Sequence, residues 1–151
     1  MIYTGALRSL YPNVRWLAIM DDSTAEKTLS TVVGWPSDVP KPTVAELEVA
    51  VITVIRVIKI AECKAEAQRR IYAILPQWKQ ANLTARGVEL NAKMLTGGTL
   101  TQAEKDERTA GFALWEKVKA IRAASNLIEQ DILASADPAN FDVANSPRWP
   151  A

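Results

Sequence analysis

A chain of 151 residues has the length of one ordinary domain, and its 48% hydrophobic and 23% charged residues predict a folded core rather than disorder. The 18 basic and 17 acidic residues leave a net charge of +1, which gives no overall field to attract nucleic acid or an anionic membrane. The chain has no histidine, which removes the commonest general base and zinc ligand, and its one cysteine cannot form an internal disulfide.

Two stretches bear on export and on membranes. Residues 1–5 lack the basic and then apolar pattern of a signal peptide. The most apolar run, residues 49–61, is interrupted by Arg56 and Lys59 and is too short to span a bilayer. We therefore expect a soluble protein without a cleaved export signal, in which Cys63 is a small apolar helix residue rather than a reactive thiol.

Residues 1–42 are expected to form a small N-terminal segment that mixes helix and strand. A short helix is predicted at residues 6–11, before a stop at Pro12 and Asn13. Residues 14–20 and 29–35 favour two short strands that pair as a hairpin. Between them, residues 21–24 predict either a turn or the N-cap of a helical turn with Glu26. Three prolines then predict a stiff connector: Pro36, Pro40 and Pro42.

A long helix is predicted over residues 43–75. Thr43 and Glu46 form a capping box, in which the hydroxyl and the carboxylate satisfy free backbone donors at the helix start. Residues 49–60 are dense in β-branched side chains, so a strand is the competing prediction for that stretch. Three-four spacing, which is typical of a heptad seam, links the following positions: Val44, Leu47, Val51, Val54, Ile58, Ala61, Ala65, Gln68, Tyr72 and Leu75.

Apolar residues also lie outside that seam, which predicts a helix covered on more than one side. β-branched residues at both seam positions favour three or four strands over two, so we expect a homo-oligomer and favour a trimer. Tryptophans spread along the chain are typical of core or interface anchors. The residues expected to form the interface are Val51, Ile52, Val54, Ile55, Ile58, Trp78, Trp115 and Trp149.

Two more helices and a tail are predicted after Pro76. The second helix carries apolar residues at three-four spacing from Trp78 to Leu95 and ends at Gly97-Gly98. The third begins at a capping box, Thr101 with Glu104, and continues to residue 134. The short connection predicts an antiparallel helical hairpin. The fold class is therefore mainly α, with three regions: the N-terminal α/β segment 1–42, the helical bundle region 43–134 and an extended tail 135–151.

The motifs of catalytic and cofactor-binding sites are missing from the sequence. Gly97-Gly98 lacks the rest of a phosphate-binding loop. The acidic pairs, such as Asp21-Asp22, are typical of a turn and of helix N-termini, where negative charge is favoured. A glycosidase would need a buried carboxylate with a raised pKa, which nothing in the sequence indicates. We predict no catalytic residues, no metal and no cofactor, and neither nucleic acid nor a membrane as partner.

Landmarks along the chain resemble small tail proteins of bacteriophages and prophages, the XkdW-like group. In the N-terminal part these landmarks are Leu10-Tyr11-Pro12, Trp16, Asp21-Asp22, Trp35, Pro40-Lys41-Pro42-Thr43 and Glu46-Leu47-Glu48. The C-terminal part is similar to helical segments of phage tail and tail-fibre-associated proteins, through Cys63-Lys64, Arg69-Arg70-Ile71, residues 76–83, residues 85–90, residues 115–126, residues 137–142 and Arg148-Trp149-Pro150.

The resemblance implies a place in the virion tail after assembly in the host cytoplasm. The expected function is a non-enzymatic component of a phage tail, baseplate or tail fibre, which bundles with copies of itself or with a fibre or baseplate protein. The alternative is a tail-fibre assembly chaperone that guards a hydrophobic fibre end with the helix around Ile52 and Ile55 and is not retained in the virion. A small lytic enzyme is a third hypothesis.

Overall fold

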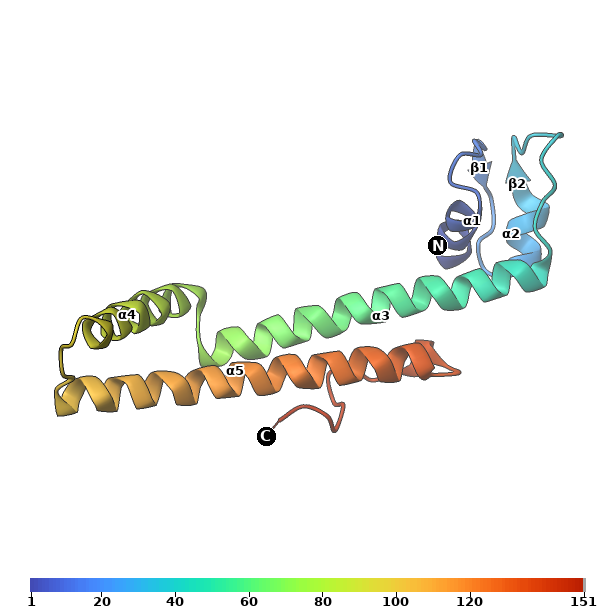
Figure 1. Cartoon of the computed structure of the whole chain (residues 1–151). Helices are drawn as coiled ribbons and strands as arrows, with labels where there is room; N and C mark the ends of the chain where they lie inside the picture. Colours follow the sequence, from blue (N-terminus) through green and yellow to red (C-terminus); the bar gives the residue numbers. More distant parts are fainter. Residues whose placement is uncertain (151) are drawn as a thin grey trace. The chain divides into compact units, whose positions relative to one another are not determined.

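The computed structural model describes residues 1–150 and is mainly helical, which confirms the predicted fold class (Figure 1). Its elements are α1 (Ile2–Leu10), β1 (Ala18–Ile19), α2 (Ala25–Thr31), β2 (Val32–Val33), α3 (Val44–Ile74), α4 (Gln77–Leu95), α5 (Gln102–Ala134) and the 3-10 turn η1 (Pro138–Asn140). They divide into two compact units. The first holds Met1–Ala61 and Ile132–Phe141; the second holds Glu62–Asp131 and the tail from Asp142. The division between the units runs through α3 and α5.

The expected hairpin of the first unit exists but is much shorter than the two predicted strands. β1 and β2 pair antiparallel over two residues each, with Ala18 opposite Val33 and Ile19 opposite Val32. The prediction that a strand begins at residue 29 was wrong, because residues 25–31 form α2. The N-cap alternative explains this helix: the Thr24 hydroxyl accepts the backbone N–H of Lys27 at 3.2 Å.

The acidic pair before α2 acts as a local clamp. Asp22 Oδ1 accepts the backbone N–H of Thr4 at 2.7 Å and the Thr28 hydroxyl at 3.2 Å, so it ties α1 to α2. Hydrogen bonds from Ser23 and the nearby Lys27 lower the pKa of Asp21. Both carboxylates therefore satisfy donors within the fold, as expected for a turn next to a helix start.

The core of the first unit lies where α1 and α2 pack on the first turns of α3. Leu7 and Leu47 are fully buried there. Three aromatic rings cover its edge: Trp35 stacks on Trp16 with centroids 5.6 Å apart and meets the edge of Tyr11 at 5.2 Å. Such ring geometries add roughly 0.5–1.5 kcal/mol each beyond area burial.

α3 begins at the predicted capping box. The backbone N–H of Thr43 donates to Glu46 Oε2 at 2.7 Å, and the N–H of Glu46 donates to the Thr43 hydroxyl at 3.2 Å. These hydrogen bonds lower the pKa of Glu46. Residues 49–60 are helical throughout, so the strand alternative for them was wrong.

Burial along α3 follows the predicted seam only in part. Leu47 and Val51 are buried in the first unit, but Ile58 is 46% exposed. In the second unit the buried positions are Cys63, Ala67 and Ile71. These three lie off the seam, because α5 packs against another face of α3 there.

The second unit contains the predicted antiparallel hairpin of α4 and α5 (Figure 1). Lys93 near the end of α4 lies 2.8 Å from Glu104 near the start of α5, and Arg86 lies 3.1 Å from Glu107 one turn further on. Gly97 makes the reversal with a φ of 82°, a value that favours glycine. The predicted cap of α5 also forms, since the N–H of Thr101 donates to Glu104 at 2.8 Å.

One face of α5 is buried, and the tail packs back on the second unit. Val118, Ile121, Ser125, Ile128 and Ile132 are all buried. Trp149 is 9% exposed, its ring N–H donates to the carbonyl oxygen of Val143 at 2.8 Å, and the guanidinium of Arg70 lies 4.9 Å from the ring centre. The tail is therefore docked through a tryptophan that the sequence marked as an anchor.

Candidate helix-docking surfaces

The eight residues expected to form an interface lie in different surroundings. Val51 and Trp149 are buried within their own units, and Val54 and Ile55 pack partly against the first core. Ile52 and Trp115 are half-buried. Only Ile58 and Trp78 present large exposed surfaces, and they belong to different units.

An apolar stripe runs the full length of α4 on its solvent side. Its large members are exposed: Trp78 by 62%, Val88 by 63% and Leu95 by 88%. Ala81, Ala85 and Ala92 fill the positions between them and are also exposed. At about 100° per residue the six side chains span an arc of about 100°, the width typical of a helix face that packs on another element. We call these six residues the α4 stripe.

The opposite face of α4 is the one that packs on α5. Leu90 is buried there and Leu83 is half-buried. At Gly111 of α5, an added Cβ would lie 2.9 Å from Leu83 Cδ1, so the helices approach closely where that side chain is absent. Three-four spacing predicted the α4 stripe but not its exposure. Leu83 and Leu90, seven residues apart, are the sequence signal for the face that packs on α5.

A groove opens between α4 and α5 beside the stripe. It has a volume of about 350 Å³ and an apolar floor that includes Leu83, Leu90, Phe112 and Trp115. Val88 belongs both to this groove and to the α4 stripe. The hairpin therefore presents two neighbouring apolar surfaces, the groove and the α4 stripe, which share Val88.

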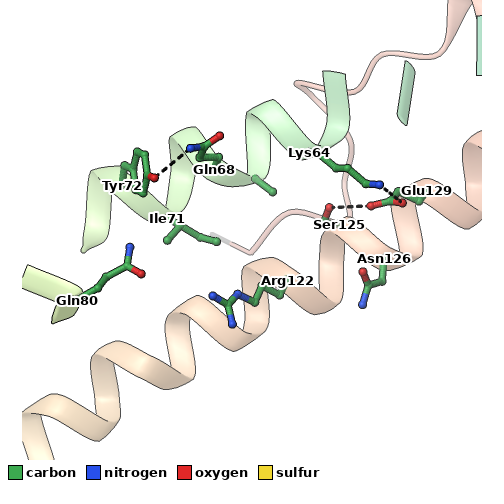
Figure 2. Close-up of a pocket in the computed structure, with 10 residues that line it drawn as sticks. Lys64, Gln68, Ile71, Tyr72, Gln80, Arg122, Ser125, Asn126 and Glu129 are labelled. Carbon is green, nitrogen blue, oxygen red and sulfur yellow. Dashed lines mark hydrogen bonds and ion pairs between the residues drawn. The ribbon is translucent and has the colours of Figure 1, made fainter. Parts of the chain in front are cut away.

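A more polar cleft of about 390 Å³ lies where α3, the start of α4 and α5 meet within the second unit (Figure 2). On one wall Gln68 Nε2 donates to the Tyr72 hydroxyl at 3.0 Å. On another, Lys64 lies 3.7 Å from Glu129. Figure 2 also shows Arg122 at the cleft, where its guanidinium suits carboxylates and other acceptors.

Cys63 lies beside this cleft, and its sulfur is not activated as a nucleophile. Its sulfur is fully buried and lies 3.4 Å from the Ser125 hydroxyl. Burial raises the pKa of the Cys63 thiol, with a smaller contribution in the same direction from Glu129. At neutral pH the sulfur is therefore the thiol rather than the reactive thiolate.

Ion pairing and capping shift the strongest acids of the second unit in the other direction. Hydrogen bonds from Arg69 and Arg70 lower the pKa of Glu66 to about 2. Lys93 and the backbone of Thr101 lower the pKa of Glu104 to about 2. These carboxylates are held in the charged state, which suits structural ion pairs and not a general acid.

Comparisons with known proteins returned no match, neither to a family model nor to a curated protein or a solved structure. Within residues 1–150, no three or more acidic or cysteine side chains gather as metal ligands would. None of the helices in that range has the length and apolar character needed to cross a membrane.

Proposed function

We propose that the chain is a non-enzymatic structural component of a bacteriophage tail, baseplate or tail fibre, and that it acts by helix-mediated assembly with itself or with a fibre protein. Its location would be the virion tail, after assembly in the host cytoplasm. The observation that carries the proposal is the α4 stripe.

An exposed apolar face of this length favours a role in assembly for a physical reason. Burying a large apolar side chain stabilises a complex by roughly 1.5–3 kcal/mol. Trp78, Val88 and Leu95 leave most of that unrealised in the isolated chain, since each is at least 62% exposed. Large contiguous apolar surfaces on proteins mark interaction sites. A protein whose partner covered α4 would recover this free energy.

The resemblance of the landmark residues to small phage tail proteins supports the particular context. Those landmarks occupy structural positions here: Thr43 and Glu46 cap α3, and Trp149 docks the tail. They act in packing and capping, which fits a protein whose function is assembly.

The directions of the pKa shifts support the non-enzymatic part of the proposal. Glu66 and Glu104 have lowered pKa values, whereas a carboxylic acid that donates a proton at neutral pH needs a raised one. The thiol of Cys63 is buried with a raised pKa, so it lacks the thiolate character of a catalytic cysteine.

Mass spectrometry of washed phage particles tests the proposed function. The expected result is a stoichiometric number of copies per tail, retained through density-gradient purification. Deletion of the coding sequence should leave particles with incomplete tails or fibres. Absence from particles, together with normal tails after deletion, would refute the proposal.

The alternative is the assembly chaperone, and the same experiment separates the two. A chaperone would be abundant in infected cells and absent from washed particles, and its deletion would still cause loss of fibres. The observation that favours it is the exposure of large apolar side chains on α3, where Val49, Val57 and Ile58 are each at least 46% exposed.

A further inference from the structure

The side-chain sizes along the α4 stripe follow almost the same order from either end of the helix. Trp78 and Leu95 are the large residues at the two ends, and alanines lie next to each of them at positions 81 and 92. Ala85 and Val88 flank the middle. A second helix with the same sequence, running in the opposite direction, therefore offers matching sizes at every level.

We propose that the α4 stripe pairs with the α4 stripe of a second copy of this chain, antiparallel and related by a two-fold axis. The inference rests on the proposed function, since it takes assembly between helices as the activity and names the partner of one surface. It goes further because it names the molecule that covers the α4 stripe, the direction of its helix and the register of the contacts.

The register follows from the three-four spacing. Trp78 packs against Leu95 of the second copy at both ends of the pair. Ala81 lies opposite Ala92 of the second copy, where two methyl groups let the backbones approach closely. At the centre of the pair, Ala85 packs against Val88 of the second copy. Repeated three-four spacing is what brings such side chains into knobs-into-holes contact.

Charges along the edges of the stripe permit this self-pairing. Asn82 and Glu89 form one edge, and Thr84 and Asn91 form the other. The antiparallel register brings Asn82 beside Glu89 of the second copy, so an amide N–H₂ meets a carboxylate and no like charges face each other. A strongly acidic or basic partner would find no complementary row on either edge. Opposed helix dipoles add to the preference for the antiparallel direction.

The length of α4 limits how much surface the pair can bury. α4 has 19 residues, or about five turns. Specific interfaces bury about 1,200–2,000 Å² in total, and a pair of helices this short lies near the lower end. We therefore expect a reversible dimer, which concentration-dependent measurements on the full chain resolve.

Sedimentation equilibrium of the purified full chain, from about 1 to 200 µM, tests the pairing. Ala85→Glu places two carboxylates at the centre of the pair and should weaken dimerisation at least tenfold. Ala120→Glu is the matched control, because Ala120 is also an exposed helical alanine but lies on α5. The control should dimerise like the parent chain, and circular dichroism should show the same helix content in all three proteins.

Cysteine cross-linking tests the direction. Variants Ala81→Cys and Ala92→Cys are prepared separately, mixed and treated with a short bifunctional maleimide. The antiparallel register predicts mixed dimers between the two variants, with little product from either alone. Native Cys63 is fully buried and is common to both, so the parent chain gives the background.

Three results would overturn the inference. A monomer at 200 µM would show that the stripe does not bind itself; any liposome or fibre binding would then identify its true occupant. Cross-linked Ala81→Cys homodimers in excess over mixed dimers would indicate a parallel pair. A trimer, or any oligomer that survives Ala85→Glu, would place the interface elsewhere. Because these measurements use purified protein, they are independent of whether the chain is found in particles.

Discussion

Replacing Trp149 by alanine should release the C-terminal tail from the second unit. Trp149 is 9% exposed, and its ring N–H donates to Val143 while Arg70 covers its face. A buried tryptophan removes about 200 Å² from water, worth about 5 kcal/mol at about 25 cal/mol per Å². The extended-chain reference overstates burial, so we expect a loss of about 3–5 kcal/mol.

Trp78→Ala is the matched control, since Trp78 is 62% exposed. The same arithmetic gives at most about 2 kcal/mol for it. Urea unfolding followed by circular dichroism measures both losses in an Ala85→Glu background, in which self-association is weakened. Hydrogen exchange of residues 142–150 should accelerate only in Trp149→Ala. Equal losses in the two variants, or unchanged exchange in the tail, would contradict the assignment of Trp149 as the anchor.

Three further outcomes are expected. The pKa of Glu66 is about 2 in the folded chain, below its unfolded value. The stability that the charged carboxylate adds to the fold is therefore present above pH about 4.5 and is lost as the pH falls towards 2. Glu66→Gln should remove this pH dependence from the free energy of unfolding measured in urea. Ile58→Asp should cost only about 1 kcal/mol of folding stability, since Ile58 is 46% exposed, and should leave the α4-mediated dimer intact; loss of the dimer in ultracentrifugation would instead place Ile58 in the interface. Cys63 should react with a thiol reagent only on unfolding, and fast native labelling would contradict its burial.

The starts of α3 and α5 could be predicted from sequence because their causes are local. Thr43 with Glu46 and Thr101 with Glu104 satisfy backbone donors three residues away, so each cap is written in four consecutive positions. The strand predicted from residue 29 failed for a related reason. β-branched side chains favoured a strand, but the Thr24 cap starts a helix that continues through them to Thr31.

The surroundings of the candidate interface residues could not be predicted in the same way. Trp78 and Trp149 look alike in sequence, yet one is exposed on α4 and the other is buried by the tail. The difference depends on contacts between segments that are far apart along the chain, such as the 4.9 Å approach of Arg70 to Trp149. Periodicity identifies an apolar face, but it does not identify the element that covers it.

The α4 stripe separates what the sequence determines from what the tertiary structure determines. The sequence by itself determined that α4 is a helix and that its six apolar positions share one face, because three-four spacing and backbone geometry are local properties. Only the tertiary structure decided which face meets α5. Leu83 and Leu90 pack there because Gly111 lets the helices approach closely, and the α4 stripe is left in solvent. That choice depends on side-chain volumes across two helices, and it turns a predicted packing seam into a surface free to bind a partner.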